Sequence, residues 1–229
     1  MRSNIDRAIL FDFDGTLLDS YATHYAAYER MFARFGVTID RDSFARSYYP
    51  DWQSTFRAFG LAEELWKAAN AMWLQENARE AAPLRDACMS VISCLQPHWR
   101  LGLVTSGSRV RVMEDLQRTG LDAHMEVVVT GNDVEQRKPA PDGILQALDK
   151  LGVPAERAVY IGDTPIDQQT ARAANVRFVG IRSQYAALDV EPMLAALAEL
   201  PGVIEGLVGS SGLEPLTSTV SRWRSNQLS

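Results

Sequence analysis

Near its start the chain has a short apolar stretch that ends in a cluster of acids. Residues 8–11 are Ala-Ile-Leu-Phe, and Asp12, Phe13, Asp14 and a Gly-Thr pair follow directly. A short apolar run that stops at a turn is typical of a buried strand in a parallel sheet. Asp12 and Asp14 are two positions apart, so on an extended strand their side chains leave from the same face. Because two like charges this close repel unless a cation or a proton separates them, the run predicts a metal-assisted site at a strand end.

Further apolar runs, separated by stretches with helical spacing, predict a parallel sheet. The five predicted strands are Ala8–Phe11, Leu101–Val104, Val127–Val129, Val159–Ile161 and Phe178–Ile181. Between them, one helix is expected to begin at Pro83, and two more stop at Gly120 and Gly152. The apolar residues at 193, 194 and 197 predict another helix that begins near Pro192. Strands that alternate with helices favour an α/β fold, a Rossmann-like parallel sheet flanked by helices.

One segment breaks this alternation and predicts a helical insertion. From Ser20 to Ala82 no apolar run indicates a strand, whereas the helical spacing is strong. Aromatic residues three and four positions apart form a stripe, which we interpret as a packing surface: Tyr21, Tyr25, Tyr28, Phe32 and Phe35. The predicted domains are a core of residues 1–19 and 83–205, a helical cap of residues 20–82 inserted after the first strand, and a C-terminal extension of residues 206–229.

Charge and composition limit the classes of partner. The formal net charge of −6 argues against nucleic acid and against an anionic membrane, which both favour clustered Lys and Arg. No stretch approaches the roughly 18 apolar residues of a membrane span. Cys88 and Cys94 lie in a helical segment and fit small buried side chains better than a disulfide or a metal site. We therefore expect a soluble cytoplasmic protein, either a monomer or a homodimer.

The later strands are also followed by residues that can carry chemistry. Residues 105–108, Thr-Ser-Gly-Ser, form a turn whose backbone N–H groups suit an oxyanion, although a simple helix cap fits equally well. Lys138 stands before Pro139, which fixes the local backbone, yet a lone lysine on a loop is usually solvated. Asp163 and Asp167 straddle the start of a helix after the fourth strand, where the first acid alone would also serve as a cap.

The order of these motifs is more specific than any one of them. DxDGT at residues 12–16, Thr-Ser at 105–106, Lys-Pro at 138–139 and GDxxxD at 162–167 resemble the four motifs of the haloacid dehalogenase-like superfamily. The resemblance covers about Arg7–Arg182 and is nearest to its phosphoglycolate phosphatase and β-phosphoglucomutase branches. It implies a Rossmann-like core, with the helical insertion in the place of the superfamily's first type of cap.

The resemblance also implies a role for each motif residue in phosphoryl transfer. Asp12 is implied as the nucleophile that forms an aspartyl-phosphate, and Asp14 as the general acid and base. Thr105, assisted by the backbone of Ser106, is implied to bind the phosphoryl group, and Lys138 to stabilise its developing charge. The implied phosphate-binding set also includes Gly15, Thr16 and Gly107.

The implied cofactor is Mg²⁺. Asp163 is implied as a direct ligand and Asp167 as a ligand or a neighbouring acid, with Asp12 and the backbone carbonyl of Asp14 as the other protein ligands. Carboxylate oxygens clustered without His or Cys prefer a hard cation, and phosphate chemistry favours Mg²⁺.

Asp14 also distinguishes between branches of the superfamily. Haloacid dehalogenases proper lack an acid at this position because their reaction needs no proton on the leaving group, so Asp14 favours phosphoryl transfer. Phosphonatase-type relatives use a cap lysine to form a Schiff base. Lys67 is the only lysine of the predicted cap and lies on an apparent long helix, which speaks against that route.

Two features of the predicted cap bear on the substrate. Tyr49 and Trp52 lie in the irregular stretch Ser47–Trp52, which resembles the superfamily's specificity loop and fits a packed helix corner equally well. His24 follows Asp19 at a spacing that also occurs in β-phosphoglucomutase-like members. The simpler interpretation of His24 is a hydrogen bond near the hinge of the cap.

We therefore expect a Mg²⁺-dependent phosphatase whose partner is a small phosphorylated metabolite. One alternative is a sugar-phosphate mutase, which returns the phosphoryl group to its substrate. No cap motif resembles the one that holds a bisphosphorylated sugar in such mutases. The other alternative is a non-catalytic binding protein that kept the fold, and the intact set of motif residues speaks against it.

Overall fold

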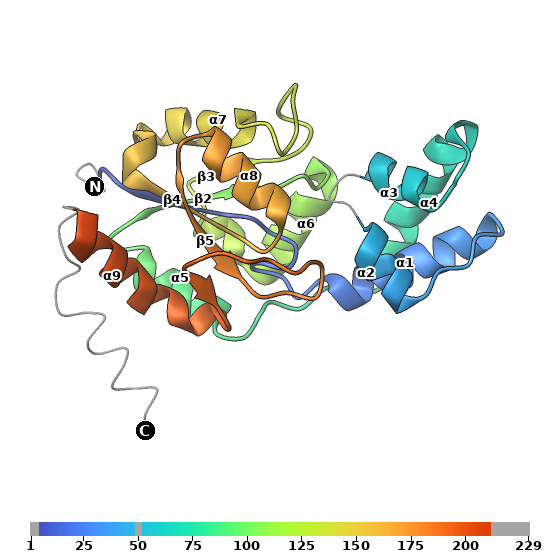
Figure 1. The fold of residues 1–229 in the computed structure, drawn as a ribbon, viewed down its shortest axis with the longest axis horizontal. Coiled ribbons are helices and arrows are strands. Elements are labelled where there is room, and N and C mark those ends of the chain that lie inside the picture. The colour runs from blue at the N-terminus through green and yellow to red at the C-terminus, as the bar shows by residue number, and fades with distance from the viewer. Residues whose placement is uncertain (1–4, 49–51, 212–229) are drawn as a thin grey trace.

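A six-stranded parallel sheet forms the centre of the molecule (Figure 1). The structure is a computed structural model that describes residues 5–48 and 52–211, with side chains described up to residue 207. The strand order is β3-β2-β1-β4-β5-β6. The strands are β1 (Ala8–Phe11), β2 (Arg100–Val104), β3 (Val127–Val129), β4 (Ala158–Gly162), β5 (Arg177–Ile181) and β6 (Met193–Leu194). The α/β fold class is confirmed, and the five predicted strands are found to within one residue at each end.

The register of the sheet brings the motifs to one edge. β1 lies between β2 and β4, and Phe11 at its end is level with Leu103 of β2 and Ile161 of β4. Because the three strands run parallel, the residues that follow them emerge at the same edge of the sheet, where open α/β sheets bind ligands.

Helices cover both faces of the sheet. Ile9 and Phe11 of β1 pack into one hydrophobic cluster and Ala8 and Leu10 into the other, as the period of two requires. The first cluster includes side chains of α5 (Cys88–Leu95), α6 (Arg109–Thr119) and α9 (Leu200–Ser211). The second includes side chains of α7 (Asp142–Leu151), which lies above the sheet in Figure 1, and of α8 (Pro165–Ala173). Burial on both faces explains why the strands are apolar throughout.

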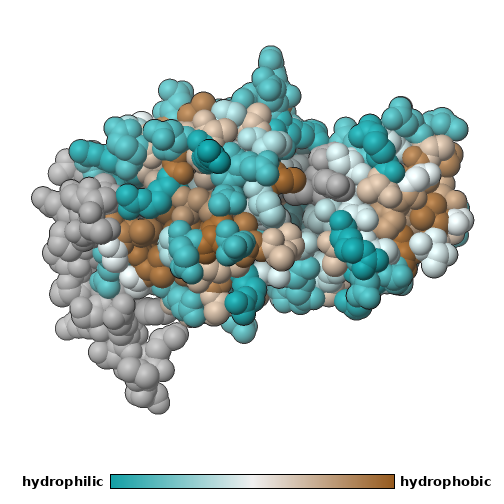
Figure 2. Space-filling view, in the orientation of Figure 1, coloured by the Kyte–Doolittle hydropathy of each residue, from teal (hydrophilic) through white to brown (hydrophobic). Residues whose placement is uncertain are grey.

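The segment between β1 and α5 forms a helical layer beside the core (Figure 1). Its helices are α1 (Tyr21–Arg34), α2 (Arg41–Ser47), α3 (Trp52–Ala58) and α4 (Trp66–Asn77). Four members of the aromatic stripe are buried in a third cluster and Phe35 is partly buried beside it, so the stripe is a packing surface. Hydrophobic residues also reach the surface at this end of the molecule (Figure 2). Short 3₁₀ turns complete the secondary structure: Glu63–Leu65, Leu121–Ala123, Ala155–Arg157 and Leu197–Glu199.

Two helix predictions are wrong in detail. α5 begins at Cys88 rather than at Pro83, because Ala87 adopts a left-handed conformation with φ of 62° and Leu84 pairs with Leu18 in an isolated antiparallel bridge. Met193 and its neighbour form the edge strand β6 instead of a helix, since they pair in parallel with β5.

The predicted domain boundaries stay predictions. The one at 19/20 falls just before α1, the one at 82/83 falls between α4 and α5, and α9 runs across the boundary at 205/206. Residues 212–229 lie outside the described residues. Within the described part of the chain, no helix is both long enough and apolar enough to cross a membrane.

Candidate active site

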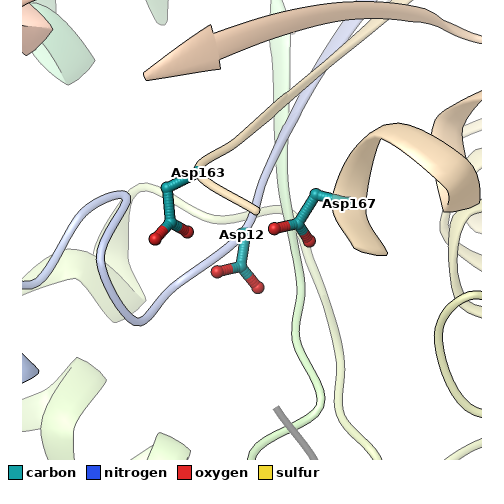
Figure 3. A group of neighbouring side chains, drawn as sticks. All are labelled: Asp12, Asp163 and Asp167. Atoms are coloured by element: carbon teal, nitrogen blue, oxygen red, sulfur yellow. The ribbon is translucent and has the colours of Figure 1, made fainter. Parts of the chain in front are cut away.

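Three carboxylates meet at the edge of the sheet (Figure 3). Asp12 follows β1, Asp163 follows β4, and Asp167 lies in the first turn of α8. One oxygen from each lies within 4.8 Å of the others, and all three residues are buried. Asp14 is not part of this cluster.

Lys138 inserts one positive charge into this cluster. Its Nζ donates to Asp12 Oδ1 at 2.6 Å and to Asp167 Oδ1 at 2.7 Å, and its side chain is only 6% exposed. Three carboxylates and one ammonium leave a net charge of −2 when all are ionised. Burial raises the pKa of Asp12 to about 7 and the charge of Asp167 adds to this, although Lys138 opposes the shift. A divalent cation would balance the charge without any proton being taken up.

Asp167 is fully engaged by the protein. Its Oδ1 accepts from Lys138 and lies 3.1 Å from the Tyr160 hydroxyl, while its Oδ2 accepts from the hydroxyl and the backbone N–H of Thr164 at 2.6 and 3.1 Å. The Tyr160 hydroxyl also lies 3.0 Å from the carbonyl oxygen of Val104. Asp167 therefore positions Lys138. We did not predict a role for Tyr160 from the sequence. It lies inside an apolar strand, and its hydroxyl group was the only feature that indicated a polar contact.

One carboxylate oxygen of Asp163 has no hydrogen-bond partner. Its Oδ1 accepts from the Thr16 hydroxyl at 3.1 Å, whereas its Oδ2 is buried and has no hydrogen-bond partner. Gly15, with φ of 80°, passes so close to this carboxylate that a Cβ there would overlap it. Burial, followed by the charges of Asp167 and Asp12, raises the pKa of Asp163 well above its usual value. An all-oxygen donor set with excess negative charge and an unpaired buried oxygen fits a hard divalent cation.

Asp14 belongs to a second network on the other side of the site. Its two oxygens face the Arg111 guanidinium, with Arg111 Nη1 3.1 Å from Oδ1 and Nη2 paired with Oδ2. His24 Nε2 lies 3.5 Å from Asp14 Oδ1. Burial alone would raise the pKa of Asp14, but Arg111 and then His24 hold it below its usual value. The prediction that the Asp14 backbone carbonyl binds the metal stays a prediction.

His24 and Arg111 are tied to the surrounding structure. His24 Nδ1 lies 2.6 Å from the hydroxyl of Tyr185, which lies 2.9 Å from Ser20 Oγ. Burial lowers the pKa of His24 to about 4, so the imidazole is neutral at pH 7. Arg111 also contacts Asp115 Oδ2 at 3.3 Å, one turn further along α6. Arg111 and Tyr185 were missed; for Arg111 the available signal was an arginine on the buried face of a helix.

The turn after β2 lies beside the carboxylates. The backbone N–H of Gly107 donates to Thr105 Oγ1 at 3.1 Å, and the Thr105 N–H donates to the carbonyl oxygen of Val129 at 3.0 Å. Thr105, Ser106, Gly107, Lys138, Asp12 and Asp14 all line one cavity of about 310 Å³. The structure thus brings the predicted catalytic residues to a single cavity.

Residues between β1 and α5 line the opposite wall of this cavity. They are Tyr28, Tyr48, Trp52, Asn70, Trp73 and Leu74, with His24 where the two walls meet. Of the two predicted specificity residues, Trp52 is among them, and Tyr49 lies outside the described residues. Gly15, Thr16 and Asp163 are not among the residues that line the cavity.

Comparison with known proteins gives this geometry a context. The sequence profile of a family described as "Haloacid dehalogenase-like hydrolase" matches residues 9–181. The chain is 30% identical to validoxylamine A 7'-phosphate phosphatase of Streptomyces hygroscopicus subsp. limoneus, across 88% of this chain and 94% of that protein. It is also 30% identical to fructose-1-phosphate phosphatase of Escherichia coli K12, across 76% and 95% of the two chains.

Solved structures show the same fold. The structure of CbbY from Rhodobacter sphaeroides in complex with phosphate superposes with a TM-score of 0.75 at 25% identity, covering 85% of this chain and 96% of that chain. A haloacid dehalogenase-like family protein from Streptococcus pneumoniae superposes with a TM-score of 0.77 at 20% identity, covering 86% and 98%.

Proposed function

The chain belongs to the haloacid dehalogenase-like hydrolase family, and from this premise we propose that it is a Mg²⁺-dependent phosphatase of small organic phosphomonoesters. Its named relatives make it a phosphohydrolase. The metal and an aspartyl-phosphate formed on Asp12 are the specific parts of the proposal. One observation carries it: Lys138 bridges Asp12 and Asp167, while the buried Oδ2 of Asp163 has no partner.

Asp12, Asp163 and the backbone carbonyl of Asp14 would hold the metal. A bound Mg²⁺ neutralises phosphate oxygens and keeps Asp12 ionised beside the other acids. Asp167 has no such task because both of its oxygens accept hydrogen bonds from the protein. Lys138 holds one oxygen of Asp12, and the other oxygen is then available for attack.

In the first step, a carboxylate oxygen of Asp12 forms a bond to phosphorus as the bond from phosphorus to the leaving oxygen breaks. Asp14 gives its proton to that oxygen, so the product leaves as an alcohol. In the second step, water attacks phosphorus, its proton passes to Asp14, and the bond between Asp12 and phosphorus breaks. Phosphate is released and both aspartates return to their starting states.

Arg111 constrains the role of Asp14. The pair with Arg111 holds Asp14 ionised in the free protein, and this is the form that accepts a proton from water in the second step. The first step needs Asp14 protonated. Asp14 must therefore take up a proton before the first step, from water or from a singly ionised phosphate ester, and its contact with Arg111 has to loosen as it does so.

The mutase alternative meets a specific obstacle. A mutase of this type holds a bisphosphorylated sugar, so a second phosphate must be bound away from the Asp12 carboxylate. Among the described residues between β1 and α5 that line the cavity, none is a lysine or an arginine. The phosphatase is therefore the function that the geometry supports best.

The test is phosphate release from a broad panel of phosphomonoesters by the full chain with Mg²⁺. We expect turnover that stops on chelation of the metal and that Asp12→Asn lowers by a factor on the order of 10⁴ or more, with the fold unchanged by circular dichroism. Retained activity in Asp12→Asn contradicts the covalent route. Isomerisation of a sugar phosphate without phosphate release contradicts the phosphatase assignment and favours the mutase.

A further inference from the structure

The two walls of the cavity differ in charge. The core wall carries Asp12, Asp14, Arg111, Lys138 and other charged groups. The opposite wall, which we call the cap wall, carries aromatic rings, one amide and one aliphatic side chain, and none of these described residues is formally charged: Tyr28, Tyr48, Trp52, Asn70, Trp73 and Leu74. An anionic leaving group would find no counter-charge there.

The cations of the core wall are mostly engaged. Lys138 is paired with two buried carboxylates. Arg111 is paired with Asp14 and contacts Asp115. Arg137 also lines the cavity, on the core side with Lys138, and its Nε donates to a backbone carbonyl at 3.0 Å. Lys138 and Arg111 thus face the carboxylates of Asp12 and Asp14, where the transferred phosphate would bind.

The cavity also contains neutral polar groups that lack partners. Trp73 Nε1 and Ser108 Oγ are both buried and have no hydrogen-bond partner, and both side chains line the cavity. The Trp73 ring is held by an edge contact with His24, at a centroid distance of 5.5 Å, and by a tilted contact with Tyr28 at 5.3 Å. Because buried polar atoms in native proteins are normally paired, this fixed indole N–H and the unpaired hydroxyl of Ser108 point to a ligand with hydroxyl groups.

We propose that the leaving group is a neutral polyhydroxylated ring, of a monosaccharide or a cyclitol, whose hydroxyls pair with Trp73 and Ser108. The proposal rests on the phosphatase function and deepens it. Such a ring has apolar C–H faces that pack on aromatic side chains, and hydroxyls that satisfy neutral donors and acceptors. The cap wall offers both kinds of contact: the rings of Tyr28 and Trp52, and the amide of Asn70.

The volume agrees with one ring next to the phosphate. About 310 Å³ is near the lower end of small-molecule sites, which span roughly 300–1,000 Å³. A second cavity of about 510 Å³ shares His24, Leu74, Ser108, Arg111 and Asn132 with the first. Asn77, whose buried Oδ1 is unpaired, also lines it. This second cavity gives room for a substituent on the ring, so the inference concerns the ring attached to the phosphate and not the full length of the substrate.

The first experiment compares matched phosphates with the full chain and Mg²⁺. Glucose 1-phosphate and glucuronic acid 1-phosphate share a ring and differ by one carboxylate, whereas cyclohexyl phosphate has a ring without hydroxyls. myo-Inositol 1-phosphate and other hexose phosphates separate the cyclitol from the monosaccharide. We expect kcat/KM for the best neutral polyol phosphate to exceed that of its carboxylate analogue, of phosphoglycolate and of cyclohexyl phosphate by at least about tenfold.

The second experiment removes the unpaired groups. Trp73→Phe keeps a ring and deletes the N–H, and Ser108→Ala deletes the hydroxyl. Each should reduce the ratio of kcat/KM for the polyol phosphate over cyclohexyl phosphate by roughly threefold to tenfold. Trp99→Phe is the matched control, since Trp99 Nε1 is also buried and unpaired but lies in the core cluster away from the cavity, and this ratio should stay within twofold.

A third measurement separates binding from chemistry. Asp12→Asn, titrated calorimetrically, should bind the neutral sugar phosphate more tightly than its carboxylate analogue without turning either over. Equal or better use of the anionic substrates, or an unchanged ratio in Trp73→Phe and Ser108→Ala, overturns the inference while leaving the phosphatase intact. No phosphate release from any compound, with cyclohexyl and p-nitrophenyl phosphates included, overturns the phosphatase function and this inference with it.

Discussion

The core wall and the cap wall of the cavity differ in the charge of their side chains and in the contacts that fix them. On the core wall, charged side chains are buried, paired and fixed by neighbours, as the contacts of Lys138 with Asp12 and Asp167 show. On the cap wall, aromatic rings such as Trp73 are fixed by packing, and the Nε1 of Trp73 has no hydrogen-bond partner. Under the proposed function, charge would recognise the transferred group, whereas shape and neutral hydrogen bonds would recognise the group released.

The difference also has an energetic consequence. A buried ion pair is costly to desolvate, and removing one partner leaves a charge that the interior cannot screen. A neutral side chain at a cavity wall carries no such penalty. Substitutions on the core wall should therefore affect both stability and chemistry, whereas those on the cap wall should affect the choice of substrate.

The largest effect is expected from Lys138→Met, which removes the cation that pairs with Asp12 and Asp167. We expect kcat to fall by a factor on the order of 10³, and the free energy of unfolding by roughly 3–5 kcal/mol. Turnover and urea unfolding measure the two effects. Lys67→Met is the control, because Lys67 is exposed on α4. Equal behaviour of the two variants would contradict the role of Lys138 in the cluster.

Arg111→Met comes next, because it breaks the pair with Asp14. We expect a loss of about 3 kcal/mol in the free energy of unfolding near pH 7. The pair holds the pKa of Asp14 below its usual 3.8, so the stabilisation is complete above that value and is lost as the pH falls through the lower pKa of the folded state. Urea unfolding of wild type and variant should show a gap that is constant from pH 6 to 8 and narrows below about pH 4. A gap that widens towards acid would show that Arg111 does not hold Asp14 ionised.

From the sequence, the motif residues of the core wall could be predicted much better than the long-range contacts that fix their side chains. Strands buried on both faces are apolar throughout, so β1 and β4 were visible, and the motif residues at their ends followed. β6 has only two residues and pairs at the sheet edge, so Met193 and Leu194 gave no strand signal. Arg111 lies 97 positions from Asp14, and no local pattern in the chain encodes a contact of that range.

Tyr160→Phe tests whether a residue behind the core wall helps Asp167 to position Lys138. The hydroxyl lies between Asp167 Oδ1 and the carbonyl oxygen of Val104, so its removal takes one contact from the carboxylate that positions Lys138. We expect a loss of about 1–2 kcal/mol in the free energy of unfolding, with kcat reduced by severalfold. Tyr25→Phe serves as the control, since its hydroxyl pairs with Glu29 on α1, away from the carboxylate cluster. If kcat fell equally in both variants, the Tyr160 hydroxyl would have no specific role in positioning Asp167 and Lys138.

The smallest effect on chemistry is expected from Trp52→Ala on the cap wall. Trp52 packs on Phe56 and Trp66 at centroid distances of 5.2 and 6.0 Å and lines the cavity as a member of the cap wall. Its loss should change the relative kcat/KM among substrates by roughly fivefold, mainly through KM, because it removes packing area for the leaving group. Trp52→Phe keeps a ring at the same place and should retain most of the original preference. If Trp52→Ala instead lowered kcat for every substrate by the same large factor, the ring would contribute to the chemistry. The claim that the cap wall affects only the choice of substrate would then be wrong.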